Sequence, residues 1–90
     1  MEYVLAIGYM ESVILDIKAN KQQITLENIE EKLNDLLNKD KKIIIAYTKM
    51  AFNNIKNSAN KVTVREMESQ IQYLKDLYTT EELIKRAKNL

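Results

Sequence analysis

The sequence contains no cysteine and no histidine, and it has a single glycine among its 90 residues. The absence of cysteine excludes disulfide bonds, thiolate chemistry and cysteine-based zinc sites. The absence of histidine removes the commonest metal ligand and the commonest general base near neutral pH. One glycine cannot build the glycine-rich loop that holds phosphate groups. We therefore expect no enzyme activity, no cofactor and no metal site.

Long apolar runs are missing as well. The longest run near the start, Tyr3–Met10, ends at Glu11, whereas a membrane-spanning helix needs about 20 apolar residues. The start also has no basic region and no small-residue cleavage site, which argues against a signal peptide. We expect a cytoplasmic protein that makes no contact with a membrane.

The apolar residues that are present recur at helical spacing. This pattern predicts an all-α fold, a bundle of four to five helices that forms a single domain over residues 1–90. The predicted helices begin near residues 3, 26, 43 and 64, and residues 81–90 form either a fifth, short helix or a continuation of the fourth. Thr25 and Thr63 are the predicted N-caps, since a threonine hydroxyl accepts a hydrogen bond from a free backbone N–H. The stretch Thr79–Glu82 could cap the fifth helix if that helix is separate.

Two stretches carry most of the apolar side chains. Nine of the thirteen residues in Ile43–Ile55 are apolar, which predicts the centre of the core, with Tyr47 and Met50 inside it. Eleven of the fifteen residues in 3–17 are apolar, which is more than one buried stripe requires. We therefore expect this first helix to be central or to form half of an oligomer interface. A close helix crossing would explain Gly8 in its middle, where glycine costs about 1 kcal/mol relative to alanine.

The two halves of the chain share a pattern. Residues 5–42 align with residues 43–80 without a gap, and Tyr9 then falls on Tyr47 and Thr25 on Thr63. One interpretation is a duplicated helix–turn–helix unit of 38 residues with pseudo-twofold symmetry, followed by a C-terminal helix. The alternative is that any two amphipathic hairpins of similar length would align equally well.

Two resemblances to known families follow from short motifs. The stretches Ile24–Ile29 and Val62–Met67 resemble the end of an EF-hand loop and its exiting helix. The positions that would hold the first calcium ligands are Ile17, Ala19 and Lys21 in the first copy, so we expect no calcium binding. The start of the chain together with Ile24–Ile29 is similar to the dimerising segment of archaeal ribosomal stalk proteins, over about a third of the chain, without that family's acidic tail.

Charge is distributed unevenly along the chain. Residues 1–38 carry a net charge of −4, residues 39–63 carry +5, and residues 64–90 are balanced. The acidic row Glu27, Glu31 and Asp35 falls on one helix face, which is most simply a solvated surface. The basic middle favours an alternative function, nucleic-acid binding, because lysines supply phosphate affinity. Its candidate residues are Lys39, Lys41, Lys42, Lys49, Lys56 and Lys61. A net charge of only +1 and the presence of only two arginines argue against it.

We favour a non-catalytic protein–protein interaction module whose partner is a protein of unknown identity. The surplus of apolar residues in 3–17 has to be covered by something, which also predicts a homodimer. The predicted partner interface is the continuous apolar face of that helix: Tyr3, Ile7, Met10, Ile14 and Ile17. By analogy, a small chain without a cofactor suits a regulator or inhibitor of phage or mobile-element type.

Overall fold

The computed structural model describes residues 2–37, 42–57 and 62–90. These residues form five helices and no strand, which confirms the predicted all-α bundle. The helices are α1 (Glu2–Ala19), α2 (Leu26–Leu37), α3 (Lys42–Asn57), α4 (Val64–Leu77) and α5 (Thr80–Ala87). None of the described helices is both long enough and apolar enough to cross a membrane.

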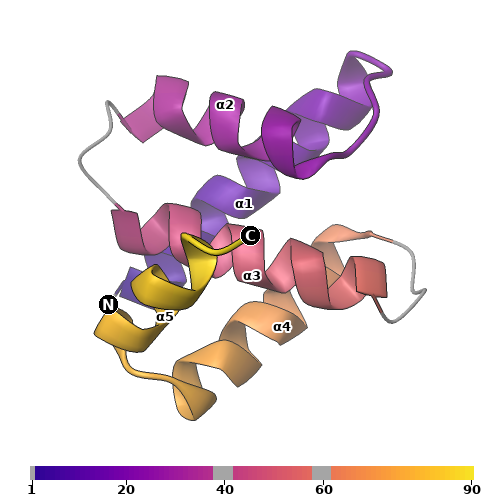
Figure 1. Ribbon diagram of the computed structural model, residues 1–90. Coiled ribbons are helices and arrows are strands. Elements are labelled where there is room, and N and C mark those ends of the chain that lie inside the picture. Colours follow the sequence, from indigo (N-terminus) through magenta and orange to yellow (C-terminus); the bar gives the residue numbers. More distant parts are fainter. Residues whose placement is uncertain (1, 38–41, 58–61) are drawn as a thin grey trace.

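Helix α3 lies at the centre of the bundle. It crosses the middle of the view in Figure 1, with α2 above it, α4 below it, α1 behind it and α5 in front. It contacts each of the other four helices. The apolar density of Ile43–Ile55 explains this position, because a helix that is apolar on most of its faces is stable in water only when neighbours cover it.

The burial of α3 confirms the predicted core. Nine of its residues are buried, and they are Ile43, Ile44, Ala46, Tyr47, Thr48, Met50, Ala51, Phe52 and Ile55. Thr48 is the buried polar residue among them, and its Oγ1 atom donates a hydrogen bond of 3.0 Å to the carbonyl oxygen of Ile44. This bond satisfies the hydroxyl inside the helix, so α3 buries no unpaired polar side chain.

The two predicted N-caps, Thr25 and Thr63, are present, and Thr79 forms a third. Thr25 Oγ1 accepts a hydrogen bond from the Asn28 backbone N–H at 3.1 Å, and Thr63 Oγ1 accepts one from the Glu66 N–H at 3.1 Å. At α5 the motif is reciprocal, because Thr79 Oγ1 accepts from the Glu82 N–H while Glu82 Oε1 accepts from the Thr79 N–H. The hydrogen bond that Glu82 Oε1 accepts from the Thr79 N–H, together with the Thr79 side chain, holds the pKa of Glu82 below its ordinary value.

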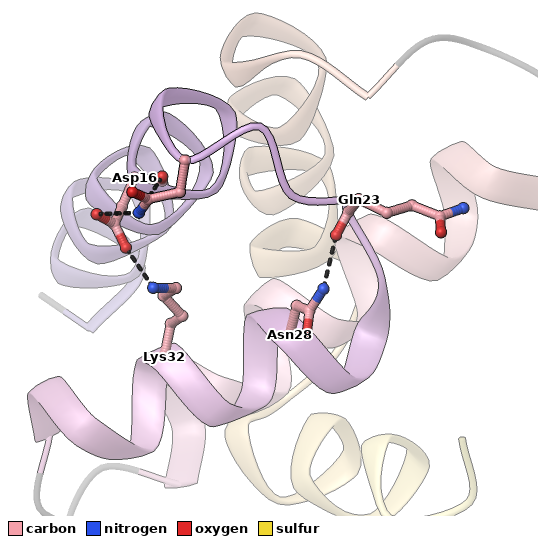
Figure 2. Close-up of polar contacts among 5 residues, drawn as sticks. Asp16, Gln23, Asn28 and Lys32 are labelled. Atoms are coloured by element: carbon pink, nitrogen blue, oxygen red, sulfur yellow. Dashed lines mark hydrogen bonds and ion pairs between the residues drawn. The ribbon is translucent and has the colours of Figure 1, made fainter.

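Polar contacts fix the α1–α2 hairpin, as Figure 2 shows. Lys32 Nζ lies 2.6 Å from Asp16 Oδ2, and Asn28 Nδ2 donates to the Gln23 carbonyl oxygen at 2.7 Å. The hydrogen bond to Asp16 holds the pKa of Lys32 above its ordinary value. The chain leaves α1 through Lys21, whose φ of 56° lies in the left-handed region. The side chains of α2 are thereby held against α1 in one register.

The last helix turns back onto α3. Helix α4 ends at Tyr78, whose φ of −128° and ψ of 151° are extended, and α5 starts after the Thr79 cap. The Arg86 guanidinium lies over the Tyr78 ring, 4.5 Å from its centroid, which holds the turn closed. Residues 80–87 are therefore a separate fifth helix, one of the two alternatives that the sequence left open.

The helix ends follow the 38-residue alignment. Helix α1 ends at Ala19 and α3 at Asn57, while α2 begins at Leu26 and α4 at Val64. The aligned threonines, Thr25 and Thr63, cap α2 and α4 in the same way. The two hairpins therefore match in layout, and their origin in a duplication stays a prediction.

Candidate interaction surfaces

The apolar face predicted for a partner lies in the chain's own core. Met10, Ile14 and Ile17 are each 0% exposed, and Tyr3 and Ile7 are partly buried against the core. The neighbours of α1 are α2, α3 and α4. The spacing correctly grouped these five residues on one face, but that face meets the chain's own helices and is not available to a partner in this structure.

The opposite face of α1 carries the apolar residues that remain uncovered. Val4 is 53% exposed, Leu5 is 46% exposed and Leu15 is 53% exposed. Gly8 and Ser12 lie between them on the exposed side of the helix. We call these five residues the outer face of α1. From Val4 to Leu15 it extends over about 16 Å at the rise of an α-helix.

Gly8 has no packing partner among the described residues. A Cβ atom built at this position would have no neighbour within 4 Å. The expected close crossing of Gly8 with another helix is therefore absent from the described residues, since the residue faces outward. The prediction of a close crossing at Gly8 is therefore not met by any of the described helices.

A shallow hollow lies beside this face, between α1 and α2. Its lining includes Ser12 and Asp16 from α1, and Lys32 and Leu36 from α2. The spacing of Ile29, Leu33, Leu36 and Leu37 in the sequence predicts an inward position for Leu36, but this side chain is 51% exposed. Leu36 therefore extends the uncovered apolar surface from α1 onto α2.

A second exposed apolar pair, Tyr73 and Leu77, lies on α4, with exposures of 56% and 49%. Nearby, the Lys75 ammonium stacks on the Tyr3 ring at 4.4 Å from its centroid and joins the end of α4 to the start of α1. Nothing in the sequence pattern distinguishes the exposed Tyr73 from the buried Tyr47. Burial, together with the charges of Glu2 and Asp76, raises the pKa of the Tyr47 phenol.

The described lysines among the six proposed for nucleic acid do not form one surface. Lys39, Lys41 and Lys61 lie outside the described residues, so the structure places only Lys42, Lys49 and Lys56. Lys42 and Lys56 stand at opposite ends of α3, about 21 Å apart along its axis. The Lys49 ammonium is paired with Glu30 at 3.3 Å. The described lysines are therefore separated along the helix or already engaged.

Lys42 and Lys49 instead line a groove between α2, α3 and α5. Its floor consists of Ala46 from α3 and Ala87 from α5, which are 2% and 5% exposed. The remaining lining residues are Glu30, Asn34, Ile45, Ile84 and Lys88. The groove encloses about 260 Å³. We call it the lysine-rimmed groove; the sequence analysis missed it because its α5 wall comes from the segment whose fold was left open.

The acidic side chains of the described residues were the candidates for binding a metal ion. No group of three or more acidic side chains there is arranged to hold a metal ion. Glu27, Glu31 and Asp35 are each exposed on α2. The sequence matches no family model, no curated protein and no solved structure. The functional inference therefore depends on the surfaces just described.

Proposed function

We propose that this chain is a non-catalytic protein-interaction module that forms a homodimer through the outer face of α1. The support is the uncovered apolar surface of Val4, Leu5 and Leu15, on a helix whose other side already completes the core. Contiguous exposed apolar surface is typical of sites that bind another protein. A module of this kind would act as a regulator or inhibitor by occupying a surface of its partner.

Gly8 is the observation that carries the proposal. Glycine in the middle of a helix costs about 1 kcal/mol relative to alanine, and here the missing Cβ makes no room for any of the described residues. A second helix that crosses the outer face at Gly8 could approach closely because no side chain stands in its way. The same face on a second copy offers a partner helix with a glycine at the matching place, as a twofold interface requires.

The expected dimer is modest in strength. One helix face buries less than the roughly 1,200–2,000 Å² of a standard stable interface. Leu36 on α2 would add to the contact, since it borders the same hollow as Ser12. We therefore expect a monomer–dimer equilibrium in the micromolar range of concentration.

Sedimentation equilibrium over a concentration series tests this proposal. The double variant Leu5→Lys and Leu15→Lys should remain monomeric at concentrations where the unmodified chain dimerises. Tyr73→Lys, which places the same charge on the exposed face of α4, is the matched control and should dimerise normally. A monomer at high micromolar concentration of the unmodified chain would refute the homodimer.

A further inference from the structure

The lysine-rimmed groove is hollow because two small side chains face it from neighbouring helices. Ala46 of α3 and Ala87 of α5 end at Cβ, so the space between the two helices is not filled from below. Ile45 and Ile84 flank this floor and are only partly buried. The bottom of the groove is thus apolar and fits an apolar side chain.

The rim of the groove carries an excess of positive charge. Lys42 and Lys88 are exposed, and neither has an ion pair with a carboxylate in the described part of the chain. Lys49 is also in the lining, but Glu30 neutralises it at 3.3 Å. Two ammonium groups therefore remain available in the lining, beside an apolar floor.

We propose that the lysine-rimmed groove binds an acidic amphipathic helix of another protein. A leucine-sized side chain of that helix enters the space above Ala46 and Ala87, and flanking carboxylates meet Lys42 and Lys88. The helix-in-groove arrangement supplies this combination, since apolar anchors three and four residues apart leave the adjoining positions free for acidic residues. This surface is distinct from the outer face of α1, so the inference goes beyond self-association.

The size of the groove and the chemistry of its lining favour a peptide over a small molecule or single-stranded nucleic acid. The volume of about 260 Å³ is below the roughly 300–1,000 Å³ of small-molecule sites, but it accepts a single anchoring side chain. Single-stranded nucleic acid binds to grooves with aromatic side chains that stack on bases, and the lining of this groove contains no aromatic residue. A lysine rim around an apolar floor is complementary to carboxylates around an apolar anchor.

Fluorescence anisotropy with a designed peptide provides the test. The probe is a labelled helical peptide of about four turns, with leucines three and four residues apart, glutamates beside them and alanines elsewhere. Its twin has a lysine in place of each glutamate. The full chain should bind the glutamate peptide, more weakly as salt is added, and should bind the lysine twin at least about tenfold more weakly.

Variants locate the binding in the groove. Ala87→Leu fills the floor and should weaken binding of the glutamate peptide by about tenfold or more, as loss of an anchor pocket does. Lys42→Glu with Lys88→Glu keeps the floor and should weaken binding by a similar factor. Lys85→Glu, on an exposed position of α5 outside the groove, is the matched control and should bind as the unmodified chain does. Circular dichroism confirms that each variant is folded.

Several outcomes would overturn the inference. The first is that the glutamate peptide does not bind at a millimolar concentration of the protein. The second is that the lysine twin binds equally well. The third is that both groove variants bind the glutamate peptide as the unmodified chain does. Tight binding of a mixed-sequence RNA that is lost in the double lysine variant and kept in Ala87→Leu would assign the lysines to nucleic acid. Loss of the dimer in Ala87→Leu would instead assign the groove to a second copy of the chain. Neither result depends on the sedimentation of the α1 variants, so the two proposals fail separately.

Discussion

The Lys49 ammonium lies 3.3 Å from a carboxylate oxygen of Glu30, and only 14% of the Lys49 side chain is exposed. This pair joins the central helix α3 to α2 in the wall of the lysine-rimmed groove. It uses the one lysine of the groove that is well covered, and it leaves the exposed Lys42 and Lys88 without a carboxylate partner among the described residues.

The coupling between these two residues is measurable. The Glu30→Gln, Lys49→Met and double variants form a double-mutant cycle, with urea unfolding as the readout. Because 45% of the Glu30 side chain is exposed, we expect a coupling free energy of only about 0.5 kcal/mol. The coupling should fall in about 1 M salt, where charges on the surface are screened. A coupling of similar size at both salt concentrations would contradict this assignment.

Gly8→Ala should stabilise the monomer. The added Cβ meets nothing within 4 Å, and alanine is favoured over glycine inside a helix by about 1 kcal/mol, so the free energy of unfolding should rise by up to that amount. Urea unfolding at low micromolar concentration measures the change. Ser12→Ala, on the same face, is the comparison and should give a smaller gain because serine is a better helix former than glycine. A loss of stability in Gly8→Ala would mean that the position is covered.

The Gly8→Leu variant distinguishes an effect on the stability of the monomer from an effect on the affinity of the dimer. A leucine at this position faces solvent in the monomer, so unfolding at low concentration should be little affected or stabilised. In the proposed dimer it would prevent the close approach of two helices and raise the dissociation constant by about tenfold or more. Sedimentation equilibrium provides the readout. An unchanged dissociation constant would place the interface elsewhere on the molecule.

Stability should depend on the ionisation of Tyr47 at high pH. Its folded-state pKa is raised by burial and by two nearby carboxylates, so the phenol ionises more easily in the unfolded chain. The contribution of the neutral Tyr47 phenol to the free energy of unfolding is complete below the unfolded-state pKa of about 10. This contribution is lost as the pH rises from there through the folded-state pKa. Unfolding midpoints in urea from pH 8 to pH 11 follow this loss, and the decline should be shallower in Tyr47→Phe. Identical slopes for both proteins would contradict the prediction.

Two leucines on α2 provide a matched pair for the core. Leu33 is 0% exposed and Leu36 is 51% exposed, although the apolar spacing of α2 predicts an inward position for both. Leu33→Ala leaves a cavity and should reduce the free energy of unfolding by about 2–5 kcal/mol. Leu36→Ala should change it by about 0.5 kcal/mol or less, as exposed substitutions do. Similar losses for the two variants would show that Leu36 is covered in solution.

The pattern of α4 shows what the sequence could predict. Met67, Ile71 and Leu74 recur at helical spacing and are all 0% exposed, and the adjacent N-cap at Thr63 begins the helix as expected. Spacing identifies such a stripe because the remaining positions of α4 are mostly polar, so one face alone is suited to the core.

The first helix shows where prediction from sequence ends. Apolar residues occupy both faces of α1, and Leu15 and Ile14 are equally suited to the core by their side chains. The packing of the whole bundle decides which face of α1 contacts α3 and α4. The local spacing of apolar residues does not contain this information. The lysine-rimmed groove was out of reach for a related reason, because Ala46 and Ala87 come together only after α5 folds back at Tyr78.

The contact of α3 with all four other helices has a consequence for the way the molecule comes apart. Any helix that detaches exposes part of α3 to water. Opening of one hairpin therefore destabilises the packing of the other hairpin. The backbone amides of α3 should therefore be the slowest in the chain to exchange with deuterium, and they should exchange only when the whole fold opens. Whether or not its two hairpins share an ancestor, the protein then unfolds as one cooperative unit, and neither hairpin is expected to fold without the other.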